Sequence, residues 1–328
     1  MKDFAGKFAV VTGGGTGMGR ELVRQLIAEG CSVAMCDVSE KNMAETARLC
    51  QVDGVPQGAR LTAHLCDVAD EAQYLRFRDE AAKVHEMDHL HLLFNNAGIG
   101  GGASITDPER GAWERTFNVC WYGVYYGVRT FMPMLLKASD AHIVNTASIN
   151  GFWASIGPNA AHTAYSAAKF AVKGFTEALI TDLRINAPHI KCSVVMPGHI
   201  GTSIVANSRK VIAATDDDAL SPDEVARTRA RMARVGVDVS AMDDAAIQAV
   251  AAEQHRRFLE DAPTTAAQAA TIILDGVKAD RWRILVGDDA HVIDGMVRAE
   301  PENAYELDFF ERMTKATDWR LNGIAPRE

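Results

Sequence analysis

A tyrosine and a lysine, Tyr165 and Lys169, lie four positions apart in an alanine-rich stretch of the chain. In a helix this spacing places both side chains on one face, about one turn apart. A phenol, with an unperturbed pKa of about 10, is a poor base at neutral pH, but a nearby ammonium favours the phenolate and lowers that pKa. Such a pair could exchange a proton with a substrate hydroxyl while a hydride leaves or reaches the same carbon. The pattern is short, so its meaning depends on the elements that position it.

A glycine-rich turn near the N-terminus could bind a phosphate group. It follows the apolar segment 8–11 and leads directly into a helical pattern, which is the context that this motif requires. Glycines permit a tight turn and a close approach of the backbone, while unpaired N–H groups and the helix dipole attract a pyrophosphate. The expected cofactor-binding residues of this turn are Gly13, Gly15, Thr16, Gly17, Met18 and Gly19.

An aspartate, Asp37, ends the second apolar segment, about 20 residues beyond the glycines. A carboxylate at this distance can accept hydrogen bonds from both hydroxyls of an adenosine ribose, and it repels a 2′-phosphate. Positions 14–16 and 38 hold no Arg or Lys that could bind such a phosphate. We therefore expect the cofactor to be NAD in preference to NADP. The alternative is that Asp37 only caps the helix that follows it.

Short apolar segments alternate with longer helical patterns, which is typical of a parallel sheet covered by helices on both faces. Because the apolar runs are continuous, both faces of the strands should be buried. The fold class is therefore α/β and doubly wound, with a seven-stranded parallel sheet. The predicted strands are 8–11, 32–36, 59–65, 91–94, 142–145, 191–195 and 282–286.

Residues 203–262 show helical patterns alone, and we interpret them as a helical insertion before the last strand. Ser221 and Glu224 form a capping box, with proline at the first helical position between them. Ser240 and Thr265 are further expected N-caps.

The composition argues against several partners and locations. The net charge of −9, with dispersed acids, disfavours nucleic-acid binding, which usually needs a basic stripe. No apolar run approaches the roughly 18 to 20 residues needed to cross a membrane. The N-terminus runs directly into a strand-like segment, and the six cysteines form no CxxC pair, so we expect a cytoplasmic protein. The acidic run 216–218 is interpreted as a solvated turn, and no metal site is predicted.

Three motifs in chain order make this sequence resemble the short-chain dehydrogenase/reductase superfamily, in its non-extended branch. They are the glycine turn, the run Asn95-Asn96-Ala97-Gly98, and Tyr165 with Lys169. The resemblance covers roughly residues 5–205 together with the final strand.

This resemblance implies one Rossmann-type domain over residues 1–328, with strand order 3-2-1-4-5-6-7. The insertion 203–262 would then be a substrate lid, and 288–328 a helical C-terminal tail. The resemblance also implies a small-molecule alcohol or ketone as the substrate and a homodimer or homotetramer as the assembly.

The resemblance assigns roles to further residues. Ser148, soon after a strand, would donate a hydrogen bond to the substrate oxygen. Asn118 would complete a proton relay through water to Lys169, unless it is only a polar residue that kinks its helix. With Tyr165 these are the expected catalytic residues. Besides Tyr165 and Lys169, the cofactor contacts that carry over by matched motif are Asp67, Val68, Asn95, Ala97, Gly98, Pro197, Gly198, Ile200 and Thr202.

The loop between Ser148 and Tyr165 is a few residues longer than the family usually has. Ser155 within this loop could replace Ser148, but Ser148 is preferred because it directly follows a strand. Aromatic groups near the substrate would favour a bulky apolar or aromatic molecule. Packing in the core or at a subunit interface explains the loop aromatics equally well. The expected substrate contacts are Phe152 and Trp153 in this loop, with His199 on the opposite wall.

The function expected from these residues is NAD-dependent interconversion of a secondary alcohol and a ketone, with Tyr165 as the acid/base. A cofactor-sensing protein without turnover and a structural oligomer are alternatives with the same fold. A sensor has no chemical need for both Tyr165 and Lys169. Replacement of Tyr165 by Phe therefore separates a sensor from an enzyme.

Overall fold

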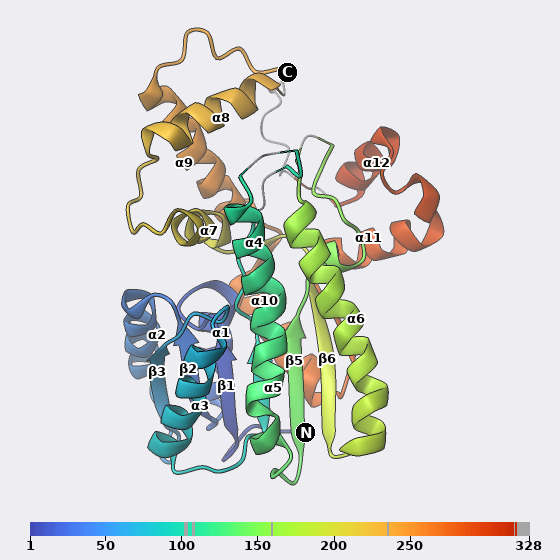
Figure 1. Cartoon of the computed structure of the whole chain (residues 1–328). Helices are drawn as coiled ribbons and strands as arrows, with labels where there is room; N and C mark the ends of the chain where they lie inside the picture. The colour runs from blue at the N-terminus through green and yellow to red at the C-terminus, as the bar shows by residue number, and fades with distance from the viewer. Residues whose placement is uncertain (102–103, 107–108, 159, 235, 318, 320–328) are drawn as a thin grey trace.

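A seven-stranded parallel sheet forms the centre of the molecule, and helices cover both of its faces (Figure 1). The computed structural model describes residues 1–101, 104–106, 109–158, 160–234, 236–317 and 319. The strands are β1 (Phe8–Thr12), β2 (Ser32–Asp37), β3 (Leu61–Leu65), β4 (Leu92–Asn95), β5 (Ala141–Thr146), β6 (Ile190–Pro197) and β9 (Arg283–Val286). Their order is β3-β2-β1-β4-β5-β6-β9, and all neighbours pair in parallel. The predicted fold class and strand order are confirmed.

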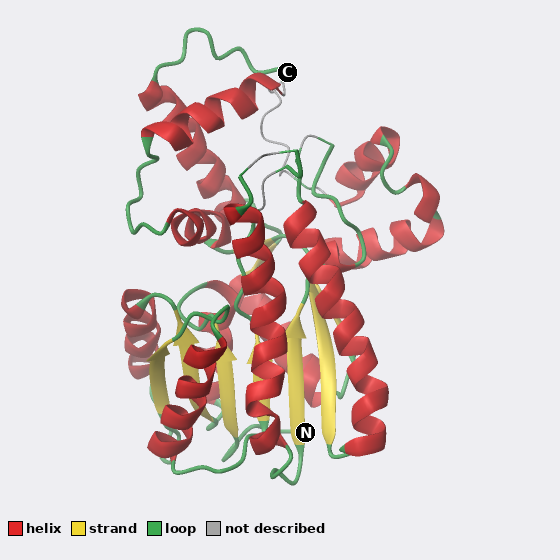
Figure 2. Ribbon diagram, in the orientation of Figure 1, coloured by secondary structure: helices red, strands yellow, loops and turns green. Residues whose placement is uncertain are grey.

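Two helix layers enclose the sheet (Figure 2). One layer contains α1 (Gly17–Ala28), α2 (Glu40–Asp53) and α10 (Ala266–Lys278), and the other contains α3 (Glu71–His85), α5 (Gly123–Leu135) and α6 (Thr163–Asn186). On β1, Ala9 and Val11 pack in the core of the first layer, whereas Phe8 and Val10 pack in the core of the second. This alternation follows because successive side chains of a strand point to opposite faces.

Three helices lie above the carboxyl ends of the strands (Figure 1). They are α7 (Ile204–Ala213), α8 (Pro222–Arg234) and α9 (Asp244–Glu260), and they occupy the predicted helical insertion. Val225 and Met232 of α8 pack against Ile247 of α9 in a small separate core. A short parallel pair, β7 (Ile200–Gly201) with β8 (Thr264–Thr265), joins the two ends of the insertion. The insertion therefore covers the edge at which open α/β sheets bind ligands.

The helix caps test the local predictions. Ser221 Oγ accepts from the Glu224 backbone N–H at 3.3 Å, and a Glu224 carboxylate oxygen accepts from the Ser221 N–H at 2.8 Å, so this capping box is confirmed. Thr265 also caps its helix as predicted. The prediction for Ser240 is wrong, because α9 is capped by the carboxylate of Asp243. Asp243 immediately precedes the helix, where a side-chain acceptor can reach the first free N–H groups.

After β9 the described chain continues as a helical tail, and residues 318 and 320–328 of the predicted tail lie outside the described residues. The tail contains α11 (Asp288–Ala299), the 3₁₀ turn η3 (Pro301–Asn303) and α12 (Leu307–Thr317). Phe309, Phe310 and Met313 of α12 pack against the region around η2 (Ile149–Gly151), which follows β5. In the described part of the chain, no helix combines the length and the apolar character that a membrane span requires.

Candidate active site

The glycine turn lies between β1 and α1, and neighbouring backbone leaves no room for a Cβ at Gly13 or Gly19. A Cβ on Gly13 would lie 2.9 Å from the Ala97 Cα, and one on Gly19 would lie 2.0 Å from the Gly13 carbonyl oxygen. Thr16, the N-cap of α1, makes no capping hydrogen bond with its side chain, and the first turn holds no acidic residue. The N–H groups at the start of α1 are therefore available to an anion. These features fit the pyrophosphate of a dinucleotide.

Asp37 lies at the carboxyl end of β2, bonded to the glycine turn. Its Oδ2 accepts from the Gly15 N–H at 3.0 Å, and its Oδ1 accepts from the Ser39 N–H at 3.1 Å. The cap of α2 is Ser39, so capping does not explain Asp37. Burial raises the pKa of the Asp37 carboxyl above its ordinary value, and the backbone N–H groups oppose this shift. Arg20 lies nearby, but its guanidinium donates to the Gly15 carbonyl at 2.5 Å and to Thr46 Oγ1 at 3.1 Å.

The segment after β4 crosses directly over the glycine turn. Thr12 Oγ1 accepts from the N–H groups of Asn96 and Ala97, both at 3.0 Å. The Asn95 side chain, however, turns into the core, where it is 1% exposed and donates to Asn145 Oδ1 at 2.8 Å. The expectation of a cofactor contact is therefore corrected for this side chain: only the Asn95 backbone borders the groove.

Asp67 and Val68 follow β3 and contact the helices of the second layer. Asp67 forms an ion pair with Arg115 at 2.7 Å, from α4 (Gly111–Phe117). Val68 is buried and lies close to Gly123, where an added Cβ would be 2.8 Å from Val68 Cγ2. The structure thus places both residues beside the end of β3, near Asp37 at the end of the adjacent β2.

Tyr165, Lys169 and Ser148 come together at the carboxyl end of β5. Lys169 Nζ donates to the carbonyl oxygen of Thr146, the last residue of β5, at 2.8 Å. The same nitrogen lies 5.3 Å from the centroid of the Tyr165 ring. The Ser148 hydroxyl lies close enough to Tyr165 to lower the pKa of that phenol. A Cβ on Gly98 would lie 3.4 Å from Lys169 Nζ, so the segment after β4 also reaches this group.

The pKa values of this group differ from the expectation. Burial raises the pKa of Tyr165, and the nearby Ser148 hydroxyl opposes this shift only in part. Burial also lowers the pKa of Lys169. We expected the ammonium to lower the tyrosine pKa, but Lys169 Nζ lies beside the ring and bonds to Thr146. In this arrangement burial is the larger effect, and Tyr165 keeps its proton.

Asn118 begins a five-residue π-helix, η1 (Asn118–Tyr122), between α4 and α5. Its side chain is half-buried, and η1 packs against α6, which carries Tyr165. Turns of π-helix within α-helices occur often at functional sites. The geometry agrees with a distortion of the helix at Asn118, and its place in a proton relay stays a prediction.

The segment 197–202 runs from the end of β6 toward the glycine turn. The Gly198 N–H donates to the Val286 carbonyl of β9 at 3.0 Å. Ile200 is buried, and Thr202 lies beside Gly17, where an added Cβ would be 3.1 Å from Thr202 Cγ2. The sequence-predicted residues Pro197, Gly198, Ile200 and Thr202 therefore border the same edge of the sheet as the glycine turn.

Comparison with known proteins identifies the family. The family model described as short chain dehydrogenase matches residues 7–213. The chain is 32% identical to SadH of Mycobacterium tuberculosis over 298 residues, which cover 91% of this chain and 92% of SadH. This chain is a short-chain dehydrogenase/reductase. Its relatives are dehydrogenases and reductases of CH–OH groups, so it is an oxidoreductase.

Three further comparisons give this dehydrogenase a structural and a chemical context. Its fold matches a short-chain dehydrogenase/reductase from Burkholderia phymatum, solved in complex with NAD, with a TM-score of 0.73 and 30% identity over 92% of this chain and 95% of the other. It is 35% identical to the 3-alpha-(or 20-beta)-hydroxysteroid dehydrogenase of M. tuberculosis over 198 residues, which cover 60% of this chain and 70% of the relative. A metagenomic short-chain oxidoreductase in complex with NADP matches with a TM-score of 0.52 and 26% identity, over 60% of this chain and 83% of that chain. Proteins of this fold therefore bind either NAD or NADP.

The structure corrects the expected substrate contacts in the loop after β5. Trp153 is 1% exposed, and its indole N–H donates to the Ala304 carbonyl of the tail at 2.7 Å. Its ring stacks on Phe310 at 6.1 Å between centroids. Phe152 is half-buried under the guanidinium of Arg283. These aromatic residues pack against the tail and β9, which is the packing alternative stated above.

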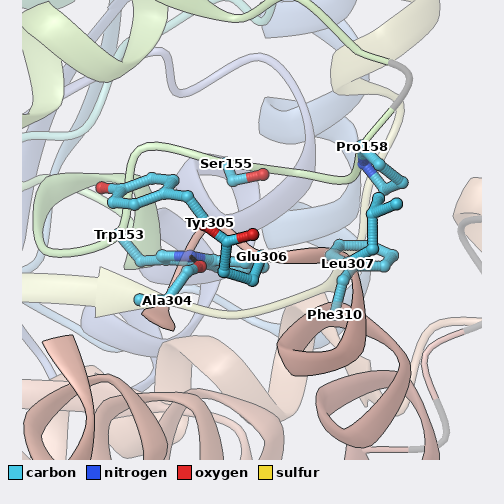
Figure 3. Close-up of a pocket in the computed structure, with 8 residues that line it drawn as sticks. All are labelled: Trp153, Ser155, Pro158, Ala304, Tyr305, Glu306, Leu307 and Phe310. Atoms are coloured by element: carbon cyan, nitrogen blue, oxygen red, sulfur yellow. Dashed lines mark hydrogen bonds between the residues drawn. The ribbon is translucent and has the colours of Figure 1, made fainter. Parts of the chain in front are cut away.

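Ser155 also faces the tail, away from the group formed by Tyr165, Lys169 and Ser148. Figure 3 shows it beside Trp153, Tyr305 and Leu307, around a cavity of about 20 Å³. Such a volume holds about one water molecule. Because Ser148 is the serine that lies close to Tyr165, the structure favours Ser148 over Ser155, and its catalytic role stays a prediction.

His199 is likewise turned away from the expected substrate wall. Its side chain is 3% exposed, and its Nε2 lies 2.8 Å from the Phe258 carbonyl oxygen of α9. The imidazole thus connects segment 197–202 to the helical insertion, and it is corrected from a substrate contact to a packing residue.

The sequence reasoning missed the aromatic surroundings of Tyr165. The His162 ring lies 4.8 Å from the Tyr165 ring, between centroids. Trp113 stacks on Phe117 at 5.3 Å, and its indole N–H donates to Thr163 Oγ1 at 3.1 Å. Burial lowers the pKa of His162 to about 4, so its imidazole is neutral near pH 7. The three-residue spacing of His162 from Tyr165 at the start of a helix was the available signal.

The sequence also did not reveal the contacts of α7 with the glycine turn and with the segment after β4. Asn207 Nδ2 donates to Thr16 Oγ1 at 3.0 Å, and Ser208 Oγ accepts from the Gly100 N–H at 2.7 Å. Through these bonds the insertion reaches both the glycine turn and the segment after β4. Among the described residues, no group of three or more His, Cys, Asp or Glu side chains is placed to hold a metal ion.

Proposed function

We propose that this dehydrogenase uses NAD to interconvert a secondary alcohol and a ketone, with Tyr165 as the residue that transfers the proton. The observation that carries the proposal is the meeting of Tyr165, Ser148 and Lys169 at the carboxyl end of β5, beside the glycine turn. A bound nicotinamide ring would accept or supply the hydride at the carbon whose oxygen exchanges the proton.

Ser148, Tyr165 and Lys169 would have different roles in the proton transfer. Ser148 Oγ accepts from the Asn150 N–H at 3.1 Å, which leaves its own proton for a substrate oxygen. The neutral Tyr165 hydroxyl is a proton donor to a ketone oxygen. Lys169 uses one N–H on Thr146 and keeps its other N–H groups for a ribose hydroxyl and for a water held near Asn118. In the direction of alcohol oxidation, the proton would leave from Tyr165 along that route.

Asp37 supports the choice of NAD. Its carboxylate lies at the end of β2 and is bonded to the glycine turn, and the nearby Arg20 guanidinium already bonds to Gly15 and Thr46. A 2′-phosphate would meet this negative charge, and the nearby guanidinium is already bonded. Thermal unfolding with equal concentrations of NADH and NADPH tests this, because a ligand of the folded state raises the midpoint according to its affinity. NADH should stabilise more, and a larger shift with NADPH would contradict the assignment.

The proposed substrate is a bulky apolar or aromatic alcohol or ketone. His162, which packs on Tyr165, provides apolar surface for such a molecule, and so does the stacked pair of Trp113 and Phe117, which bonds to α6 through Thr163. The hydroxysteroid dehydrogenase relative points to the same substrate class. A screen of aromatic and alicyclic alcohols, hydroxysteroids included, with NAD should give turnover. Activity confined to short linear alcohols would contradict this proposal.

We also propose a cytoplasmic homodimer or homotetramer. All six cysteines are buried free thiols, as in proteins of reducing compartments. Tyr122 in η1 and Phe170 in α6 are 39% and 42% exposed, and they offer apolar surface to a second subunit. Light scattering on the purified protein should give a multiple of the chain mass, and a monomer would contradict the proposed assembly.

A further inference from the structure

Asp289, in the first turn of α11, is a buried carboxylate outside the proton-transfer group. It is 3% exposed. Its Oδ2 accepts from the His199 backbone N–H at 2.7 Å and from Trp319 Nε1 at 2.8 Å. The first donor belongs to segment 197–202, and the second lies beyond α12, at the end of the described chain. One carboxylate oxygen therefore connects the end of the tail to the segment that borders the nucleotide groove.

The Asp289 carboxylate fits into its site because two neighbouring residues are glycines without a Cβ. A Cβ on Gly198 would lie 2.3 Å from either carboxylate oxygen, and one on Gly287 would lie 2.5 Å from Oδ1. Oδ1 has no hydrogen-bond partner among the described residues. The stabilisation of this buried group thus rests on the two donors to Oδ2, and loss of either donor would be costly.

Packing holds the Trp319 indole toward Asp289. Trp319 is 4% exposed, and its ring lies 6.4 Å from that of Trp153, between centroids. It shares one apolar cluster with Phe309 and Met313 of α12. The donor is therefore part of the folded tail and keeps its direction as long as the tail stays packed.

We propose that Asp289 and Trp319 are positioning residues that hold segment 197–202 in the conformation that binds the nicotinamide carboxamide. This inference rests on the proposed function, because it concerns the residues expected to contact that ring. The tail would then support cofactor binding without touching the cofactor. The adenosine and pyrophosphate groups would bind at Asp37 and the glycine turn. In the described part of the chain no hydrogen bond joins these sites to Asp289 or Trp319, and segment 197–202 meets the glycine turn through Thr202 beside Gly17.

A comparison of NADH with ADP-ribose, which lacks the nicotinamide, tests this inference. Dissociation constants would be measured by calorimetry for wild type, Trp319→Phe and the matched control Trp282→Phe. Trp282 is 46% exposed, so its replacement removes no buried hydrogen bond to a carboxylate. Trp319→Phe removes a hydrogen bond to a charged acceptor, which predicts about a tenfold rise in the NADH dissociation constant. The affinity for ADP-ribose should not change, and the control should bind both ligands like wild type.

A second variant tests the charge of the Asp289 carboxylate. Asp289→Asn keeps the shape and an acceptor oxygen but removes the charge, so it should weaken NADH binding in the same direction, by less than Trp319→Phe. Equal weakening of NADH and ADP-ribose would show a general structural role and overturn the proposal. Unchanged NADH affinity in both variants would also overturn it.

The wild-type measurement separates this inference from the proposed function. If wild type binds neither NADH nor NADPH, the proposed function fails and the inference fails with it. If wild type binds NADPH instead, only the cofactor assignment fails. The same comparison, with NADPH and 2′-phospho-ADP-ribose, then decides the inference.

Discussion

The loop between β5 and α6 packs against different partners at its ends and in its middle. Ser148, at its start, lies close to Tyr165, just beyond its end, and Tyr165 lies beside Lys169. Trp153, in the middle, is buried against the tail and bonds to Ala304. The aromatic content of an active-site loop therefore does not by itself indicate a substrate contact. The ends of this loop carry the residues proposed for proton transfer, and its middle packs against the tail.

The largest effect is expected at the end of the loop. Tyr165→Phe removes the proton-transfer hydroxyl, and general acid–base catalysis of this kind contributes about 10² to 10⁴ in rate. Turnover should fall by that factor, while NADH still shifts the thermal midpoint as in wild type. Steady-state kinetics and thermal unfolding of the same preparation measure both. Full activity in Tyr165→Phe would contradict the assignment of Tyr165. Absence of turnover in wild type and variant alike, with NADH binding intact, would favour a protein that only senses its cofactor.

A substitution in the middle of the loop should lower the stability of the fold more than the activity. Trp153→Ala leaves a cavity between the loop and α12, and truncations of buried aromatic residues cost about 3 to 5 kcal/mol. Chemical denaturation should show a loss of this size in the free energy of unfolding. Turnover of the folded fraction should fall far less than in Tyr165→Phe. A variant that kept its stability but lost substrate affinity would place Trp153 at the substrate after all.

Two serines in the same loop provide a matched pair. Ser148→Ala removes a donor to the substrate oxygen, and loss of such a donor costs about 10² to 10³ in kcat. Ser155→Ala removes a hydroxyl that borders the small cavity at the tail, so kcat should stay near the wild-type value. Parallel kinetics on the two variants measure the contrast. If the larger loss occurred at Ser155, the middle of the loop would belong to the active site.

Much of this site could be predicted because its determinants are local in sequence. The glycine turn, Asp37 and the pair of Tyr165 and Lys169 each depend on one strand end or one helical turn. The strand order followed from the family resemblance, and the buried strands from continuous apolar runs. Asp37 could also be separated from a plain helix cap, but only once Ser39 was seen to cap α2.

The remaining features depend on contacts between distant parts of the chain. Trp153 bonds to a residue 151 positions away, and Trp319 reaches Asp289 across 30 positions. The direction of the Asn95 side chain depends on Asn145, 50 positions away, in the adjacent strand. Hydrophobic periodicity predicts that such residues are buried, but it does not predict which residues they pack against. The same limit applies to the raised pKa of Tyr165, which depends on how closely the surrounding elements pack.

The smallest expected effect concerns His162, which packs on Tyr165 at the end of the loop. Burial lowers the pKa of His162 to about 4, whereas the unfolded chain restores a value of about 6.5. Between these values the unfolded state binds the extra proton, so stability present above pH 6.5 is lost as the pH falls toward 4.

His162→Phe keeps a ring on Tyr165 but cannot titrate. Its thermal midpoint should fall less steeply than that of wild type from pH 6.5 to 4, with equal slopes above pH 7. Part of the slope should persist, because burial also lowers the pKa values of His85, His91 and His142 to about 4. Identical slopes in both proteins would show that His162 is hydrated, and the end of the loop would then be more open to water than its packing indicates.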